Sequence, residues 1–488
     1  MISNLILGFQ VLLDPSVLLI LVLSVMLGIL IGVLPGIGPA PTVALLLPFT
    51  YDMPPLTSLI MLCSVYLASQ YGGSITSIAI GVPGEASSAA TILDGFALTK
   101  KGFPGKALGV SLVASCTGGM IGTLFLIALS WPLVNFALKF GPAEYFALAC
   151  FGLSIVSSVT GPSIVKGFVA TFIGLFLATI GMDQLTGNPR LTFGITNLIG
   201  GIDLVPLLVG LFAVSEVFKG VEEIATVSAA KNISSKLPNL RDLRSIAGTT
   251  IFGSLIGTIV GAIPGAGATI ASFIAYNEAK RFSKKRAQFG KGCLEGVAAP
   301  ESANNASVAG ALIPLLTLGI PGSATTAVLI GAFMIQGLRP GHELFMEKAQ
   351  IVYGLFSSML IANFVMFFVG LLGTKLWIKA IKTPPAYLFP IIFAFAFIGA
   401  YSINSNPFDI WVMMFFGFLG YLFKKLDFPV VATVIAFVLE PLAEMSFRRA
   451  LILSDGNLGI FVTEPISLVL IILAFFSFVY PLIRSLKK

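Results

Sequence analysis

Long windows without a single charged residue follow one another along almost the whole chain, separated by short charged segments. The charge-free windows include 15–51, 53–84, 107–138, 145–165, 167–182, 204–215, 245–277, 302–338, 349–374, 383–408, 410–423, 428–439 and 465–483. A helix that crosses the hydrocarbon core of a bilayer needs about 20 mostly apolar residues. The pattern therefore predicts an all-α, polytopic integral membrane protein with roughly a dozen crossings.

Two of these windows, 15–51 and 245–277, are too short for two full crossings and contain a Gly/Pro break near the middle. The segments on either side of the second window, 219–244 and 280–291, are rich in Lys and Arg, which is typical of cytoplasmic loops. A segment that begins and ends on one side must turn inside the membrane. Its 33 residues rise about 50 Å as a helix, whereas two crossings need about 60 Å. We therefore predict a broken or re-entrant helical hairpin in each window.

Two motifs occur twice, in the same order. Residues 32–38 (GVLPGIG) and 261–267 (GAIPGAG) share the pattern G-x-x-P-G-x-G at an offset of 229 residues. Residues 80–84 (IGVPG) and 318–322 (LGIPG) match at an offset of 238 residues. Two motifs that recur at nearly one offset predict an internal duplication.

The charge bias at matching positions of the two halves is opposite. The first motif is followed by the basic run 280–291 in the second half, but by a stretch without Lys or Arg in the first half. After the second motif the bias reverses, since Lys100, Lys101 and Lys106 follow it in the first half. Opposite bias predicts two inverted structural repeats, an arrangement found in many secondary transporters.

The expected organisation is a first membrane repeat at 1–218, a cytoplasmic linker at 219–244, a second membrane repeat at 245–445 and a C-terminal transmembrane helix within 446–488. Five passes in each half and one terminal helix give about 11 crossings plus two hairpins. Arg448 and Arg449 then lie on the outer side, against the positive-inside rule.

The composition excludes several other classes of protein. Hydrophobic residues make up 56% of the chain and charged residues 10%, against about 25% charged in soluble domains. So few polar groups cannot cover a water-facing surface, which excludes a soluble enzyme, a disordered protein and a nucleic-acid-binding module. The lipid bilayer is the expected partner, with no nucleic acid. The cysteines lack metal-ligand spacing, so we expect free thiols and no cofactor.

The Gly/Pro motifs interrupt helices inside the membrane and expose backbone groups there. Pro removes a donor, Gly admits a positive φ, and the freed groups must find partners within the bilayer. Half-helix N-termini can bind a carboxylate, and freed carbonyls can ligate a cation. The alternative is a pair of kinked helices packed by small residues. The predicted break residues are Pro35, Pro83, Gly84, Pro264, Pro321 and Gly322, and the predicted backbone contacts to a carboxylate are Gly36, Ile37, Gly38, Gly265, Ala266 and Gly267.

Polar side chains accompany the second motif of each half. An acidic residue well inside a bilayer costs about 2.5–3.5 kcal/mol, so Glu85 is a candidate for contact with a coupling ion or proton. The alternative is that Glu85 lies at the membrane edge or caps a helix. Residues 299–307 (APESANNAS) are interpreted as a helix start whose adjacent asparagines exceed what a cap needs. We expect Ser74, Thr76, Asn304 and Asn305 to contact the carboxylate, and Glu85 and Glu301 to handle Na⁺ or H⁺.

Motifs for catalysis in the membrane are missing from the sequence. A rhomboid-like serine protease needs a membrane histidine, but the only histidine, His342, falls in a polar segment expected to be a loop. There is no H-E-x-x-H and no G-x-x-x-x-G-K-[ST], so we expect neither an enzyme nor a nucleotide-driven step. Transport driven by an ion gradient is left, since each charge that crosses 100 mV supplies about 2.3 kcal/mol. The alternative is an uncoupled organic-anion channel or a pore-forming scaffold.

On these residues the chain resembles the large membrane subunit of the tripartite tricarboxylate transporters of prokaryotes. The resemblance spans most of the chain and rests on residues 32–38, 71–85, 261–267 and 299–322. It implies a secondary carrier that imports small di- and tricarboxylates such as citrate by symport with H⁺ or Na⁺. It also implies two protein partners, a small membrane subunit and an extracytoplasmic solute-binding protein.

The family resemblance further implies a multi-pass protein of the prokaryotic plasma (inner) membrane, with its C-terminus in the cytoplasm. By analogy with other carriers that contain re-entrant hairpins, we expect an elevator motion. The sequence leaves the identity of the carboxylate, the coupling ion and the oligomeric state open.

Overall fold

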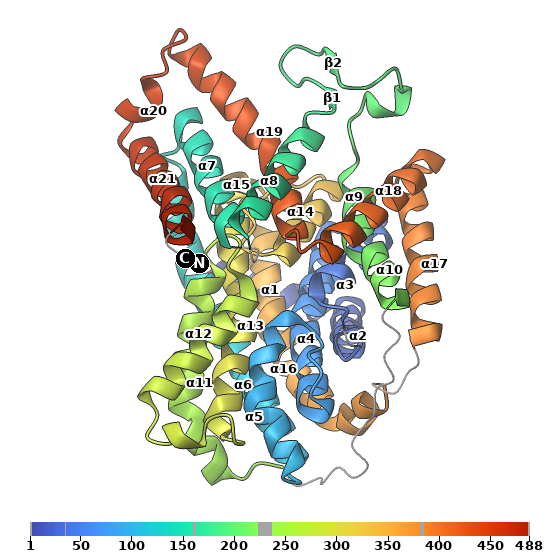
Figure 1. Cartoon of the computed structure of the whole chain (residues 1–488), viewed down its shortest axis with the longest axis vertical. Helices are drawn as coiled ribbons and strands as arrows, with labels where there is room; N and C mark the ends of the chain where they lie inside the picture. The colour runs from blue at the N-terminus through green and yellow to red at the C-terminus, as the bar shows by residue number, and fades with distance from the viewer. Residues whose placement is uncertain (1, 35, 160–162, 223–236, 381–384, 487–488) are drawn as a thin grey trace.

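The computed structural model describes the 488-residue chain except for residues 1, 35, 160–162, 223–236, 381–384 and 487–488 (Figure 1). The described residues are almost entirely helical, which confirms the all-α class. Strand pairing among them is confined to a two-residue antiparallel ribbon of β1 (Gly181–Met182) and β2 (Pro189–Arg190).

The helices of the first half are α1 (Ile2–Val11), α2 (Pro15–Gly32), α3 (Pro39–Leu46), the 3-10 turn η1 (Leu47–Thr50), α4 (Pro55–Ile80), the 3-10 turn η2 (Ala86–Ser88), α5 (Ala89–Lys100), α6 (Pro104–Ala137), α7 (Pro142–Val159), α8 (Ile164–Ala178), the 3-10 turn η3 (Thr196–Leu198), α9 (Leu204–Leu208), the π-helical segment η4 (Val209–Val214) and α10 (Ser215–Glu222). The helices of the second half are α11 (Leu240–Gly261), α12 (Gly267–Phe282), the 3-10 turn η5 (Arg286–Gln288), α13 (Leu294–Leu318), α14 (Ala324–Ile335), α15 (His342–Glu347), α16 (Ala349–Ala380), α17 (Pro385–Asn404), α18 (Pro407–Lys425), α19 (Val430–Leu453), α20 (Ile460–Thr463) and α21 (Pro465–Leu486).

Eight of the described helices are long and apolar enough to cross a membrane, by length and composition. They include α2 and α11, the first limbs of the two expected hairpins. The second limbs are shorter than the roughly 20 residues of a crossing, since α3 has 8 residues and α12 has 16. Each hairpin therefore pairs one limb of crossing length with one short limb. The expected domain boundary after residue 445 falls inside the continuous helix α19.

The two hairpins are broken in the same way. Gly36 and Gly265 have φ angles of 88° and 80°, which a residue with a side chain rarely adopts. Each donates its N–H, at 3.1 Å, to the carbonyl of a glycine in the second motif of its own half: Gly36 to Gly84, and Gly265 to Gly322. The break in each hairpin is therefore tied to the second break of the same half, and the Gly/Pro motifs of the sequence are breaks in the structure.

Close packing inside each half depends on small residues. A Cβ built on Gly84 would lie 2.4 Å from the Cα of Gly73, and one built on Gly322 would lie 2.7 Å from the carbonyl oxygen of Gly261. Real Cβ atoms essentially never approach backbone so closely, so only glycine fits at these two positions.

The helices form two bodies that differ in their packing partners. The hairpin body comprises α1–α6 and α11–α16, in which α13 packs along α6, α11 and α12, and α2 packs along α4. The flanking body comprises α7–α10 and α17–α21, in which α19 packs on α7 and α8, and α18 packs on η4. Figure 1 shows most of the hairpin body in the lower part of the molecule and most of the flanking body above it, with α14 and α15 among the helices of the flanking body. The bodies meet mainly where α3, η1 and α14 contact α9, η4, α17 and α19.

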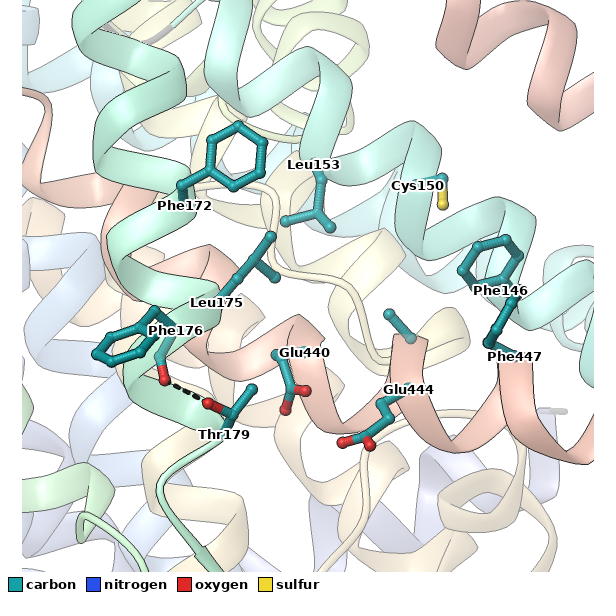
Figure 2. A pocket seen from close by; sticks show the side chains of 11 residues that line it. Phe146, Cys150, Leu153, Phe172, Leu175, Phe176, Thr179, Glu440, Glu444 and Phe447 are labelled. Atoms are coloured by element: carbon teal, nitrogen blue, oxygen red, sulfur yellow. Dashed lines mark hydrogen bonds between the residues drawn. The ribbon is translucent and has the colours of Figure 1, made fainter. Parts of the chain in front are cut away.

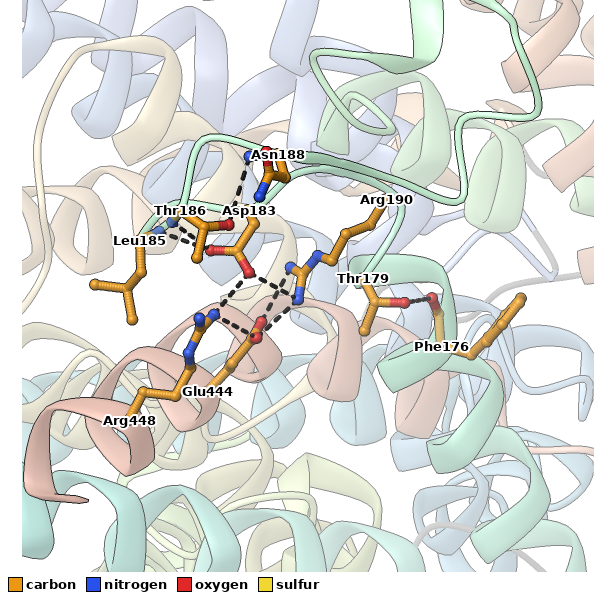
Figure 3. Close-up of polar contacts among 9 residues, drawn as sticks. All are labelled: Phe176, Thr179, Asp183, Leu185, Thr186, Asn188, Arg190, Glu444 and Arg448. Carbon is orange, nitrogen blue, oxygen red and sulfur yellow. Dashed lines mark hydrogen bonds and ion pairs between the residues drawn. The ribbon is translucent and has the colours of Figure 1, made fainter. Parts of the chain in front are cut away.

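Arg448 is paired with acidic residues rather than left free. It donates to Asp183 at 2.7 Å and to Glu444 at 3.1 Å, and Arg190 donates to the same Glu444 at 2.7 and 3.1 Å (Figure 3). The positive-inside rule counts basic residues without their partners. The structure therefore gives Arg448 acidic partners within a local ion network, whatever side of the membrane it lies on.

Asp183 organises the loop that carries the two strands. The backbone N–H of Thr186 and the guanidinium of Arg448 hold the pKa of Asp183 well below its usual range. A carboxyl whose pKa is lowered on folding stabilises the fold above its unfolded pKa, and this stabilisation is lost as the pH falls toward the folded pKa. The network is therefore fully formed at neutral pH.

Replacing Asp183 by asparagine should loosen this loop. We expect trypsin to cut after Arg190 several-fold faster in Asp183→Asn than in the wild type, because the bonds to Thr186 and Arg448 weaken. Limited proteolysis followed by mass spectrometry measures this rate. The exposed Asp455→Asn is the matched control and should behave like the wild type. Equal cutting rates in both variants and the wild type would show that the network does not hold the loop.

Candidate functional site

One cavity of about 640 Å³ is lined by the breaks of both halves. Its wall includes Gly36, Gly38, Pro83, Gly84 and Glu85 from the first half and Gly265, Ala266, Gly267, Ser323 and Thr325 from the second half. Two segments more than two hundred residues apart in sequence thus face the same space. Residues of the flanking body, among them Phe212 of the π-helical segment, complete the wall.

Several helices begin at this cavity. The first residues of α3, α12 and α14 and of the 3-10 turn η2 belong to the wall. The first N–H groups of a helix have no partner within the helix, and the helix dipole makes this end attractive to an anion. The second half offers more donors, because α12 begins with Gly267, Ala268 and Thr269, whereas α3 carries prolines at residues 39 and 41.

Side chains from each half reach across to the break of the other half. Tyr66 of α4 shares a hydrogen bond of 3.1 Å with Ser323, at the second break of the second half. Asn304 of α13 donates at 3.2 Å to Glu85, at the second break of the first half. The same 238 residues that separate Glu85 from Ser323 also separate Tyr66 from Asn304. The two contacts are therefore reciprocal, and each break is held by the helix that matches in the other half.

Glu85 lies in a polar group at the wall. Ser87 donates to its carboxylate at 2.5 Å, in addition to the bond from Asn304. With its amide nitrogen turned toward Glu85, Gln70 donates to the same carboxylate and, at 3.1 Å, to Oδ1 of Asn304. Carboxylate, amide and hydroxyl oxygens are hard ligands of the kind that a small cation prefers. The group can hold a proton or a cation next to the helix N-termini.

Glu301 lies in a separate buried group. It is fully buried on α13 and accepts hydrogen bonds from four hydroxyl groups, which come from α4, α5 and α6. The donors are Ser74 at 2.6 Å, Thr91 at 2.5 Å, Ser111 at 2.7 Å and Ser115 at 3.0 Å. Four donors satisfy both carboxylate oxygens, so Glu301 ties these helices together. Ser74 accordingly points to Glu301 and lies outside the cavity wall.

Other residues singled out in the sequence also lie behind the wall. Thr76 donates to the carbonyl of Gly73 at 3.0 Å, and Ile37 is buried in the apolar core. Asn305 donates to the carbonyl of Leu67 at 3.2 Å, and its Oδ1 is buried without a hydrogen-bond partner.

The prolines of the motifs differ in their position. Pro83 belongs to the wall, whereas Pro264 lies in the turn between α11 and α12, and Pro321 is buried next to Gly322. Pro35 lies outside the described residues.

Two expectations about local structure are wrong. Residues 299–307 lie in the middle of α13, which begins at Leu294, and are not a helix start. The helix begins earlier because Asp94 of α5 accepts from the N–H of Cys293 at 2.7 Å, a cap supplied by the other half of the chain. His342 does not lie in a loop, since it begins α15 and shares a hydrogen bond of 3.1 Å with Tyr145.

The sequence pattern did not indicate several residues of the cavity wall as site residues. Tyr66 and Gln70 lie within a charge-free window, where polar side chains are candidates for a buried polar site, and Tyr66 precedes Asn304 by 238 residues, the offset of the second motif. Lys424 and Glu216 also line the cavity. Each directly follows a charge-free window, a position that is typical of a solvated residue at the end of a helix. Their proximity depends on tertiary packing that the sequence pattern does not reveal.

A second cavity, of about 530 Å³, lies between α7, α8 and α19 (Figure 2). Its wall consists mainly of aromatic and aliphatic side chains such as Phe146, Phe172 and Phe447, with the carboxylates of Glu440 and Glu444 at one end. No described residue of either break belongs to this wall. An apolar wall that ends in two carboxylates does not suit an anion, so the cavity between the breaks is the candidate site.

Comparison with known proteins gives a family and two relatives. The model of the tripartite tricarboxylate transporter TctA family matches residues 18–435. A protein of Agrobacterium vitis, described as an uncharacterized 52.8 kDa protein in the TAR-I ttuC' 3' region, is 42% identical over 489 residues, which cover 100% of this chain and 97% of the relative. Another protein of Agrobacterium vitis, described as an uncharacterized protein in the TAR-II ttuC' 3' region, is 41% identical over 232 residues, which cover 48% of this chain and 96% of that relative. The family match spans both breaks.

Proposed function

Because the chain belongs to the tripartite tricarboxylate transporter TctA family, we propose that it is the large membrane subunit of an ion-coupled carrier for small di- and tricarboxylates. In this proposal the carrier lies in the prokaryotic inner membrane with its C-terminus in the cytoplasm. It works beside a small membrane subunit and receives its substrate from an extracytoplasmic solute-binding protein. It moves its substrate without chemical change.

One observation carries the proposal: helix N-termini from both halves of the chain line a single cavity. An N-terminus stabilises an anion by about 0.3–1 kcal/mol at an exposed site, and by up to about 2 kcal/mol where it is partly buried. A small carboxylate held by the first N–H groups of α12 and α14 needs no cationic side chain at that wall. Ser323 and Thr325 at the start of α14 supply hydroxyl donors as well.

Glu85 gives a physical reason for coupling. An ionised Glu85 and a bound carboxylate repel each other in a cavity with few other charges. A proton on Glu85, or Na⁺ bound among the oxygens of Glu85, Ser87 and Asn304, removes this repulsion. The anion and the cation therefore bind better together than separately, which is the requirement for symport.

The two halves support an inverted-repeat carrier. The matching N–H to carbonyl bonds at the breaks and the reciprocal contacts of Tyr66 and Asn304 favour two related units. Opposite charge bias in the sequence favours opposite orientation of these units. Because the cavity lies between the hairpin body and the flanking body, a sliding of one body along the other would carry the substrate across the membrane. This is the elevator motion that we propose.

Reconstitution tests the proposed function. The purified chain, with its small membrane subunit and solute-binding protein, is placed in liposomes and given labelled citrate or succinate. We expect accumulation only when an H⁺ or Na⁺ gradient is imposed, with saturation at high substrate concentration. Flux that does not saturate and that needs no gradient would instead identify an uncoupled channel.

Pro264→Ala should impair transport. Alanine restores an N–H and lets the helix continue through the turn between α11 and α12, which removes the N-terminus of α12 from the cavity. We expect uptake to fall roughly three- to tenfold, mainly through a higher KM, which is a loss of about 0.7–1.4 kcal/mol in substrate binding. Uptake kinetics in the liposomes measure this change.

The control for Pro264→Ala is Pro465→Ala, at the exposed first position of α21 and outside the cavity wall. This variant should keep wild-type kinetics. If Pro264→Ala also kept wild-type KM and maximal rate, the break would be a simple kink without a role in binding.

A further inference from the structure

A partly buried ion pair lies in the wall that the flanking body contributes to the cavity. Lys424, in the last turn of α18, donates to Glu216 of α10 at 2.6 Å and to the hydroxyl of Ser215 at 2.7 Å. The side chains of Lys424 and Glu216 are 18% and 22% exposed. Both residues line the cavity that the two breaks also line.

The described residues of the cavity wall include few charged side chains. Among the described residues of the wall, Lys424 is the only cation, and Glu85 and Glu216 are the only anions. Glu216 neutralises Lys424, whereas Glu85 has amide and hydroxyl partners but no cationic partner among the described residues. The described wall therefore carries one cation, which is paired with a carboxylate.

The pair and the helix N-termini belong to different bodies. The N-terminal ends of α3, α12 and α14 belong to the hairpin body, and Lys424 belongs to the flanking body. A monocarboxylate has only one anionic group to place at these positions. A di- or tricarboxylate can place one carboxylate at the N-termini and a second on Lys424, and the cavity of about 640 Å³ falls within the usual size range of ligand pockets.

We propose, on the basis of the proposed transport function, that Lys424 binds the second carboxylate of the substrate. Glu216 forms an ion pair with Lys424 as long as no substrate is bound. Exchange of one carboxylate for another keeps the Lys424 ammonium paired throughout. An unpaired ammonium group at this partly buried position would be costly in free energy, so the ion pair with Glu216 stabilises the carrier without substrate. Lys424 thereby selects for substrates with more than one carboxylate.

The exchange also has a consequence for Glu216. When the substrate binds Lys424, the Glu216 carboxylate loses its ion-pair partner. Glu216 and the substrate therefore compete for the Lys424 ammonium group. Removing the charge of Glu216 should therefore strengthen substrate binding, whereas removing the charge of Lys424 should weaken it. Opposite effects of two neighbouring substitutions are not expected from a pair that only stabilises the fold.

The experiment compares binding of citrate, succinate and acetate to the purified full-length chain, by thermal-shift titration and by calorimetry. The variants are Lys424→Gln, Lys424→Arg and Glu216→Gln. The matched control is Lys425→Gln, because Lys425 is the exposed neighbour and pairs with Glu222 at 2.7 Å outside the cavity wall.

Charge-assisted hydrogen bonds are strong, so we expect Lys424→Gln to weaken citrate and succinate binding at least about tenfold and to change acetate binding less than about twofold. Lys424→Arg should retain most of the preference for citrate over acetate, Glu216→Gln should bind citrate more tightly than the wild type, and Lys425→Gln should equal the wild type. If Lys424→Gln fails to fold, the Lys424→Arg and Glu216→Gln variants decide the question.

Two failures have different meanings. If the wild type binds none of the carboxylates, the proposed function is wrong, and this inference falls with it. If the wild type binds citrate and the Lys424→Gln variant keeps the same preference for citrate over acetate, the proposed function stands and the role of Lys424 is wrong. Weaker citrate binding in Glu216→Gln would likewise contradict the exchange.

Discussion

Gradient-driven uptake of carboxylate is expected to fall at least about tenfold in Glu85→Gln, while the amount of folded protein in the membrane stays near that of the wild type. The carboxylate of Glu85 is the group at the cavity wall that can take up a proton or bind a cation beside the helix N-termini. Glutamine keeps the shape of the side chain and can accept the hydrogen bonds from Ser87 and Asn304, but it can neither carry a negative charge nor take up a proton at neutral pH.

Exchange of substrate at equal ion concentrations on both sides separates coupling from binding. Glutamine resembles protonated Glu85, so Glu85→Gln should retain exchange while it loses accumulation. The exposed Glu464→Gln, between α20 and α21, is the control and should keep both activities. Uptake by Glu85→Gln that equals the wild type across a range of pH and Na⁺ concentrations would make Glu85 a structural residue.

Glu301→Ala is expected to destabilise the hairpin body by about 3 kcal/mol or more, because the buried hydroxyls that now share one carboxylate lose their acceptor. Ser74 and Thr91 donate to one oxygen of Glu301, and Ser111 and Ser115 donate to the other. The variant should be recovered in low yield and should melt well below the wild type in detergent. Fluorescence-detected melting of the purified protein measures this change.

Two further variants define the origin of the effect. Glu301→Gln keeps one oxygen acceptor and the volume of the side chain, so it should lose much less stability than Glu301→Ala. Glu347→Ala removes an exposed glutamate of α15 and should change stability by less than about 0.5 kcal/mol. A melting temperature of Glu301→Ala equal to that of Glu347→Ala would show that the four hydroxyl contacts contribute nothing to the fold.

The breaks were predictable because their cause is local. Proline lacks an N–H and glycine admits a positive φ, so a Pro-Gly pair flanked by further glycines favours a helix break, and residues 32–38 and 261–267 indicate the breaks from the sequence. The bond from Gly36 to Gly84, and its counterpart from Gly265 to Gly322, joins two motifs that the sequence analysis had found separately. The offset also links Tyr66 with Asn304, although the sequence analysis noted only the second of these residues.

The side chains that complete the site were harder to predict because tertiary packing decides their direction. Ser74 and Glu301 were both singled out, and the structure joins them to each other behind the cavity wall. On a helix, consecutive residues face different directions, which is why Asn304 reaches Glu85 and Asn305 does not.

Partners from distant segments explain the other differences. The start of α13 depends on Asp94, and Arg448 depends on Asp183, each more than a hundred residues away in the sequence. Hydrophobic periodicity contains no information about such partners, since it reports only which face of a helix is buried. Lys424 and Glu216 escaped prediction for the same reason.

Both breaks should hold one anion in the cavity between the two bodies. A structure of the purified chain with saturating citrate tests it most directly. We expect a carboxylate group within hydrogen-bonding distance of the first N–H groups of α12 and of a group at the first-half break, in the same cavity. An anion bound elsewhere, or one that contacts the break of one half alone, would contradict it.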